Sequence, residues 1–246
     1  MKRLLIAALV LFALRPAAAG ADELVADLSD HLIEITMGFE GAELLLFGAV
    51  EGEGDVVVLV HGPTEGLTVR RKEKLGPIWM NRGQMAFDGI PAFYNVMATK
   101  PPGDWLPEAT RERQQIGVEY LRLAPDARHS ATDGDKAFRD ALIRRKQALG
   151  HYSTGFGEVR MLSPRLFRTD VSFPTNVPVG NYTVEVFLVE DGEVVSAQTT
   201  PLYIKKTGVL AEIFFFAHSY AAVYGILAIV FAVLAGLGAN TLFRKI

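Results

Sequence analysis

The stretch "GNYTVEVFLVEDGEVVSAQTTPLYIK", residues 180–205, decides the fold class of this 246-residue chain. Apolar residues alternate with polar ones along its first half, at Tyr182, Val184, Val186 and Leu188. That period is typical of a β-strand with one buried face. Asp191-Gly192 is a strong signal for a two-residue hairpin turn, and a second β-rich stretch follows it. The segment therefore predicts a β-hairpin.

Further runs of strand length lie on both sides of the middle of the chain: "HLIEIT", "AELLLFGAV", "DVVVLVHGP" and "LTVRRKE" before it, "EVRMLS" and "LFRTDVSF" after it. Glycine-rich or acidic turns separate several of them, and short strands at this spacing indicate an antiparallel sandwich. The middle differs, because "LPEATRERQQIG" and "DGDKAFRDALIRRKQALG" have the patterns of helices, the second with Asp133 as its expected cap. The bases of that second helix, Arg139, Arg144, Arg145 and Lys146, are expected to form a solvated face.

The first 21 residues have the composition of a secretory signal peptide. Lys2 and Arg3 precede an apolar run over 4–14, and small residues offer cleavage after Ala19 or Ala21. The run is too short to span a bilayer, although an uncleaved anchor is the alternative. Without these residues the chain keeps 22 bases and 28 acids, a net charge of −6. Such a chain has no general attraction for nucleic acid.

The C-terminal end predicts a membrane span. Residues 221–239 are nineteen positions without a charge, which at about 1.5 Å each cover about 28 Å, close to the hydrocarbon thickness. One face of this segment is made of small residues that would let a second helix approach closely. They are Ala221, Gly225, Ala228, Ala232, Ala235 and Ala239. The expected partner on this face is a membrane protein or a second copy of the chain, and composition alone is the alternative explanation.

Together these patterns predict a mainly β chain: an Ig-like antiparallel β-sandwich with a helical insertion, followed by one C-terminal transmembrane helix. The expected divisions are a signal peptide at 1–21, an exported domain at 22–207 with its helical insert at about 105–150, a juxtamembrane and transmembrane segment at 208–240 and a cytosolic tail at 241–246. Two small domains are the alternative to one sandwich. The expected location is the bacterial inner membrane, single-pass, with the bulk of the chain in the periplasm and the C-terminus in the cytosol.

Several segments, taken in order, are similar to one known family. They are "FEGAELLLFGAV", "DVVVLVHGP", "VRRKEKLGPIWMN", "LFRTDVSFPTNVPVGNYTVEVFLVEDG" and "YGILAIVFAVLAGLGANTLFR". They resemble the transmembrane protein family of alphaproteobacteria, Alph_Pro_TM, over nearly the whole mature chain. The resemblance implies a bacterial envelope protein without an assigned activity, and it brings no catalytic residues. It also associates the chain with sulfite-exporter-like membrane transporters.

No catalytic or metal-binding pattern stands out. Cysteine is absent, so disulfides and thiolate sites are excluded. The five histidines are far apart in sequence, and "TDGDKAFRD" has only part of a calcium loop. We therefore expect no cofactor, no metal and no enzymatic activity.

The stretch "RRKEKLGPIWMN", residues 70–81, is the one candidate for an anion or partner site, through Arg70, Arg71, Lys72, Trp79 and Asn81. Strand alternation would turn Arg70 and Lys72 outward and Arg71 inward, where it would need a carboxylate or carbonyls. Trp79 would then lie across the edge of the sandwich. A strand end with an ion pair is the competing interpretation.

The functional expectation is a non-catalytic, membrane-anchored periplasmic accessory protein. Its expected partners are the lipid bilayer and a membrane protein or a second copy, and the family resemblance implies a sulfite-exporter-like transporter as that membrane protein. Nucleic acid is not expected. The alternative is a periplasmic domain that binds or senses a small oxyanion.

Overall fold

The computed structural model describes residues 24–103, 105–125, 135–208, 213 and 216–243. It is mainly β, with three sheets. The elements in chain order are β1 (Leu24–Leu28), β2 (Leu32–Ile35), β3 (Ala42–Val50), β4 (Asp55–His61), β5 (Thr64–Leu75), β6 (Ile78–Pro91), β7 (Tyr94–Ala98), α2 (Glu108–Gln114), η1 (Val118–Tyr120), α3 (Asp135–Ala148), β8 (Gly157–Glu158), β9 (Arg160–Ser163), β10 (Leu166–Phe173), β11 (Gly180–Glu190), β12 (Glu193–Lys206) and α5 (Ala221–Phe243).

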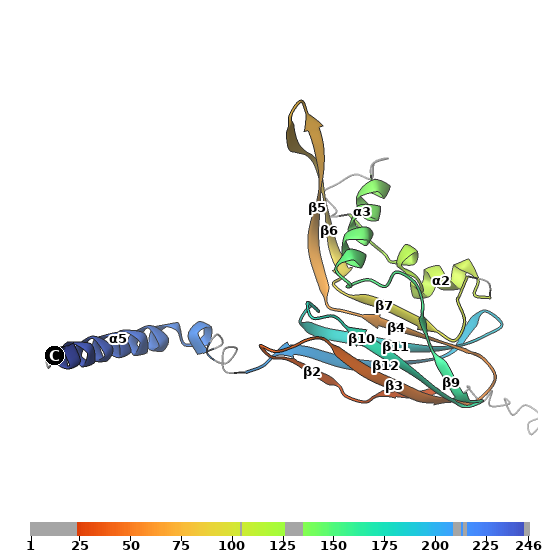
Figure 1. Cartoon of the computed structure of the whole chain (residues 1–246). Helices are drawn as coiled ribbons and strands as arrows, with labels where there is room; N and C mark the ends of the chain where they lie inside the picture. The colour runs from red at the N-terminus through yellow and green to blue at the C-terminus, as the bar shows by residue number, and fades with distance from the viewer. Residues whose placement is uncertain (1–23, 104, 126–134, 209–212, 214–215, 244–246) are drawn as a thin grey trace, which may run out of the picture.

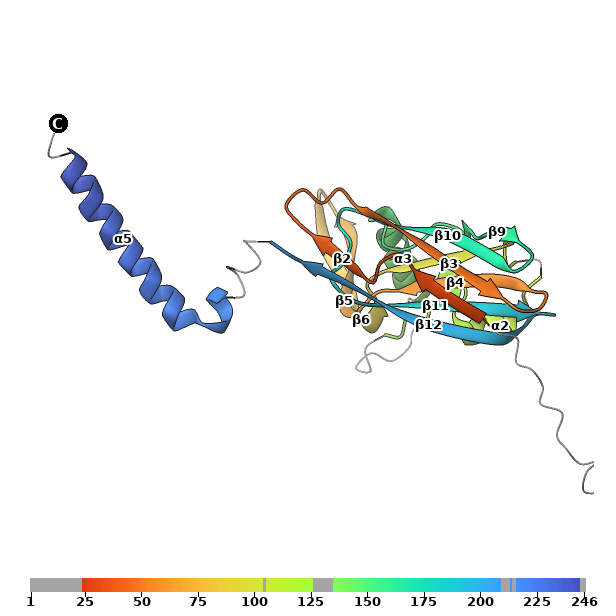
Figure 2. The ribbon, with the colours of Figure 1, turned by 90° about the horizontal axis from the view of Figure 1, so that it is seen from below.

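Two sheets stack face to face. One has four strands in the order β1-β3-β10-β9, and the other has six in the order β2-β12-β11-β4-β7-β8. Figures 1 and 2 show them as adjacent layers. Their facing side chains form one core, which includes Leu46 and Phe167 from the smaller sheet and Val58 and Val186 from the larger. The apolar alternation in the sequence is the cause, because it gives each strand one face to bury.

The larger sheet is also buried on its second face. The second core contains Val57 and Leu59 of β4 and Phe187 of β11, covered by residues of β6, α3 and the segment around η1, such as Phe87, Leu142 and Ile116. Every residue from Val56 to Val60 is 0% exposed. A strand covered on both faces has a continuous apolar run in place of alternation, which is the pattern of "VVVLV". The domain therefore has three layers, with the larger sheet in the middle.

The hairpin at the end of the domain is confirmed. Glu190 pairs with Glu193 across a two-residue turn. Asp191 and Gly192 both have positive φ, 46° and 81°, which is the geometry of a type I′ turn.

The third sheet is a long hairpin that sequence patterns did not predict. Strands β5 and β6 form a two-stranded antiparallel sheet that rises away from the stacked layers beside α3 (Figure 1). We call this hairpin the arm. It is inserted between β4 and β7, which are themselves neighbours in the larger sheet. Backbone hydrogen bonds from Gly62 N to Phe93 O (2.8 Å) and from Ala92 N to Pro63 O (2.7 Å) join the two ladders. The arm therefore continues the most buried pair of strands.

The expected fold class needs correction in two respects. The sandwich is not wholly antiparallel, because β12 pairs with β2 in parallel and β7 pairs with β8 in parallel. The expected transmembrane helix is also wrong: no helix among the described residues is long and apolar enough to cross a membrane.

Two other expectations fall on undescribed residues. The signal peptide at 1–21 and the cap at Asp133 both lie outside the described part of the chain.

Candidate functional site

The register of the arm decides which side chains share a face. Arg70 lies opposite Gln84, Lys72 opposite Asn81, and Lys74 opposite Trp79. Residues directly opposite each other in an antiparallel pair project from the same face, and so do alternate residues along one strand. We call the face with Arg70, Lys72, Lys74, Trp79 and Asn81 the basic face. Four of the five residues of the candidate anion or partner site are thus on one side of the arm.

Arg71 projects from the opposite face, as alternation predicted, but its environment is different from the expected one. Its guanidinium lies over the ring of Phe138 on α3, 4.8 Å from the ring centroid. The expected carboxylate or carbonyl partner is replaced by a cation–π contact, which suits a cation that remains partly hydrated. Arg71 is exposed, so the expectation that it turns inward to a buried partner is wrong. The reason is that the arm extends away from the sandwich, so neither face of the arm is buried in a core at Arg71.

A bulge separates the covered part of the arm from the bare part. The pairs Arg71–Gly83 and Lys72–Asn81 leave Arg82 as an extra residue in β6. On the near side, Val69 and Met85 pack into the second core, and an added Cβ at Gly83 would touch Phe138 at 3.4 Å. Bulges bend a ladder and increase its twist. The bulge therefore lies where support from α3 ends.

The tip of the arm exposes three large apolar side chains. Ile78 is 62% exposed, Trp79 is 65% exposed and Met80 is 48% exposed. The turn that precedes them is Gly76-Pro77; Gly76 has a φ of 63°, and proline fixes a negative φ, so the turn is of type II′. The prediction that Trp79 lies across the edge of the sandwich is wrong, because the ladder continues to Leu75–Ile78 and carries Trp79 to the tip.

An ion pair between a buried ammonium and a partly exposed carboxylate (35% exposed) holds α3 to the root of the arm, the end of β5 and β6 that joins β4 and β7. The Lys146 ammonium, 4% exposed as a side chain, contacts a carboxylate oxygen of Glu65 on β5. It also donates to the carbonyl of Ala92 at 2.9 Å and lies 5.7 Å from the centroid of the Tyr152 ring. The expected solvated face of this helix is therefore wrong at Lys146. A desolvated ammonium needs such partners, because a bare buried charge is costly.

Buried tyrosine hydroxyls complete the root. Tyr152 donates to the carbonyl of Pro91 at 2.7 Å, and Tyr94 donates to the carbonyl of Gln115 at 2.7 Å while accepting from the amide of Gly117 at 2.8 Å. Burial raises the pKa of both hydroxyls, so both stay protonated and able to donate. These bonds tie β6, β7 and the segment between α2 and η1 together.

One half-buried acid–base pair was missed by sequence reasoning. His61 of β4 and Glu185 of β11 approach to 3.6 Å, and the His61 ring lies edge-on to Tyr94 at 5.3 Å. Burial lowers the pKa of His61 and raises the pKa of Glu185, so both groups are biased toward their neutral forms. The residues are far apart in sequence and meet only because β4 and β11 are neighbours in the sheet. The packing of the larger sheet against the layer that covers it therefore accounts for the His61–Glu185 pair.

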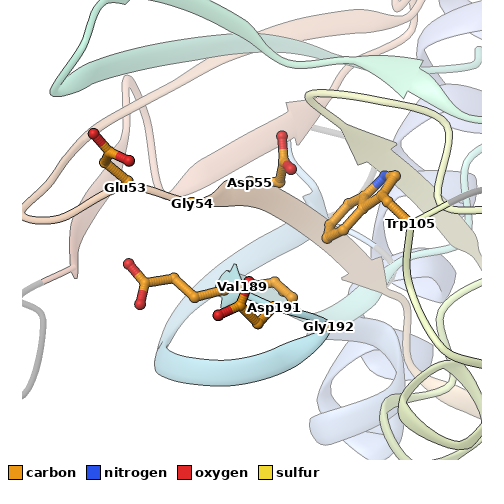
Figure 3. Close-up of a pocket in the computed structure, with 8 residues that line it drawn as sticks. Glu53, Gly54, Asp55, Trp105, Val189, Asp191 and Gly192 are labelled. Carbon is orange, nitrogen blue, oxygen red and sulfur yellow. The ribbon is translucent and has the colours of Figure 1, made fainter.

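Two open clefts lie elsewhere. One, of about 520 Å³, is lined by Glu53, Gly54, Asp55, Trp105, Val189, Glu190, Asp191 and Gly192. Figure 3 shows Trp105 at one end and Glu53 at the other. Asp55 is already engaged by the Thr99 hydroxyl (2.7 Å) and the Lys100 ammonium (3.1 Å). The second, of about 510 Å³, is lined by residues of α2, η1 and α3. Neither has a histidine in its lining, and the described residues contain no group of three or more metal-ligating side chains.

The small-residue face of the C-terminal helix is bare in the structure. Ala221, Ala228, Ala232, Ala235 and Ala239 are exposed, and Gly225 is half-exposed with no atom within 4 Å of an added Cβ. The opposite face is exposed as well, for example at Ile226 and Val230. The structure thus gives no contact that distinguishes one face of α5 from the other.

Comparison with known proteins gives one decisive result. A family model described as "Putative transmembrane protein (Alph_Pro_TM)" matches residues 23–245. The chain belongs to this family. The resemblance inferred from the sequence segments is confirmed, and Alph_Pro_TM is a family whose description is transmembrane. The comparison with curated proteins gives no match.

The buried pair at the root of the arm makes a stability prediction. Glu65→Ala leaves the Lys146 ammonium buried without its carboxylate, and we expect a loss of about 3 kcal/mol in the free energy of unfolding, measured with urea. Asp170→Ala is the matched control, because it removes the exposed Arg160–Asp170 pair (2.7 Å). That change should cost less than about 1 kcal/mol. Equal losses would mean that the buried pair does not anchor the arm.

Proposed function

We propose that this Alph_Pro_TM protein is a non-catalytic accessory protein of the bacterial envelope that binds a partner at the membrane through its arm. The observation that carries the proposal is the exposed tip, Ile78, Trp79 and Met80, at the end of a ladder rooted in the core. Exposed aromatic and methionine side chains are enriched at binding surfaces. Monomeric domains rarely leave such a group bare without a use for it.

The tip residues and the family description together indicate which class of partner the arm binds, a protein in the membrane. A rigid ladder can carry the tip to a surface that the body of the domain does not reach. The family description is transmembrane, which supports a partner in the membrane. A sulfite-exporter-like transporter is the first candidate, since the family resemblance suggests it. We also propose that the bulk of the chain lies in the periplasm, because its first residues have the composition of an export signal.

Photo-cross-linking tests the proposed role of the arm. A benzophenone side chain placed at Ile78 should give one discrete product that contains an integral membrane protein, and Trp79→Ala should weaken it. The same group at Tyr203, exposed on β12 and remote from the arm in sequence, is the control. Identical products from both positions, or none from Ile78, would rule out docking by the arm.

Export is tested separately. A reporter enzyme that is active only in the periplasm, fused after Ile204 of β12, should be active. Deletion of residues 1–21 from the same fusion should abolish that activity. An active fusion without those residues, or an inactive fusion with them, contradicts the periplasmic placement.

A small oxyanion is the alternative ligand, and one observation favours it. Arg70, Lys72 and Lys74 project from one face at two-residue spacing, about 7 Å apart. Sulfite, sulfate or phosphate bound there should raise the midpoint of thermal unfolding, and Lys72→Gln should remove the effect. Arg71→Gln, which changes a base on the opposite face, should leave it. No shift with any of the three anions would exclude this alternative.

A further inference from the structure

The outer part of the arm concentrates positive charge on an acidic protein. Residues 70–82, which we call the distal arm, contain five bases and one acid. The rest of the chain holds 20 bases and 27 acids. The distal arm therefore has a net charge of 5 − 1 = +4, whereas the rest of the chain sums to 20 − 27 = −7, so a negatively charged surface attracts the arm more than the rest taken as a whole. This asymmetry would orient the protein with its arm toward such a surface.

The apolar residues occupy the extreme end of this charged segment. Ile78, Trp79 and Met80 follow the Gly76-Pro77 turn directly, and Lys74 lies opposite Trp79 in the ladder. Lys72 and Arg70 come next along the basic face. The order from the tip inward is thus apolar, aromatic and basic. A bilayer surface presents the complementary order, from acyl chains through the interface to the headgroups.

We propose that the distal arm is a lipid-binding element whose tip enters the interfacial layer of a bilayer that contains anionic lipid. Trp79 lies at the level where its ring is half in hydrocarbon and its indole N–H is hydrated, as tryptophan prefers. Lys74, Lys72 and Arg70 bind headgroup phosphates above it, and Ile78 and Met80 supply buried apolar area. The inference rests on the proposed function, since it specifies what the arm first contacts at the membrane.

The shape of the tip suits a bilayer surface as its first contact better than a protein groove that would enclose it. The tip is a two-stranded turn with exposed side chains on both faces: Trp79 and Lys74 on one, and Met80, beside the half-buried Glu73, on the other. A groove would bury both faces and would have to match Glu73 as well as the bases. A headgroup layer requires no such match, because headgroups are mobile and Glu73 remains hydrated among them. A single acid among five bases lowers the attraction without abolishing it.

Tryptophan fluorescence tests the proposal in the full chain. The chain has two tryptophans, so Trp105→Phe makes Trp79 the only reporter. Vesicles of phosphatidylcholine mixed with phosphatidylglycerol should shift the Trp79 emission to shorter wavelength, and lipids brominated on the acyl chain should quench it. Pure phosphatidylcholine should give much smaller changes. Because the readout is local to Trp79, attachment of other parts of the chain to the vesicle does not produce it.

Two controls isolate the arm. Trp79→Phe, which keeps Trp105 near the acidic cleft, should show neither the shift nor the quenching. Glutamine at Arg70, Lys72 and Lys74 together should remove most of the response, whereas glutamine at the exposed bases Arg165, Lys205 and Lys206 should preserve it. Added salt should weaken the response of the unmodified arm.

The outcomes separate this inference from the function on which it rests. Trp79 emission that is equal in the two kinds of vesicle, or a response that survives loss of the three bases, overturns lipid binding. If the cross-link from Ile78 to a membrane protein persists in that case, the arm docks on protein and the proposed function stands. If both signals are absent, both proposals fail.

Discussion

Burial of the six-stranded sheet on both faces is the constraint on which the rest of the structure depends. The central strand β4 has no exposed residue from Val56 to Val60, so it needs the four-stranded sheet on one side and a second cover on the other. The second cover comes from the segments inserted between β4 and β8. Those segments are the helices and the arm, and it is the root of the arm that covers the sheet. The sheet thus fixes where the arm begins and which of its faces is covered.

The arm obtains a defined direction from three contacts near its root. Its ladder continues that of β4 and β7 through Gly62 and Ala92. The Lys146–Glu65 pair attaches α3 to β5, and Arg71 over Phe138 is the outermost of these contacts. An isolated two-stranded hairpin is marginal in water, so this support matters for the whole length. Beyond Arg71 the arm has charge and apolar area available for binding.

The sequence predicted strands and hairpins correctly where a strand has one buried face and ends in a short local turn. The β11–β12 hairpin follows from alternation and from Asp191-Gly192, and the apolar run of β4 indicated a strand. The arm was missed because β5 and β6 lose their alternation beyond Val69, where there is no core to impose it. The bulge at Arg82 then shifts the phase of β6 against β5, and a pattern read along one strand does not reveal that.

The candidate site was located in sequence but its arrangement was not. Residues 70–81 were selected as basic and aromatic, and alternation separated Arg71 from its neighbours. The proximity of Lys74 and Trp79 depends on pairing across the turn, and the burial of Lys146 depends on a carboxylate 81 positions away. The uncharged run at the C-terminus suggested a membrane span from composition alone, and the described helices do not support it. The pairing of Lys74 with Trp79 and the burial of Lys146 depend on contacts between distant residues, which local sequence patterns do not encode.

The central claim is that the arm stands in one direction because its root is part of the core. The absence of cysteine allows selective spin labelling at two introduced positions, Lys74→Cys on the arm and Glu193→Cys at the β11–β12 turn. Electron–electron double resonance between the labels should give one narrow distance distribution, which should broaden when Glu65→Ala removes the anchor. A broad distribution in the otherwise unchanged protein would contradict the account, because an arm without a fixed direction could not present its tip to a surface.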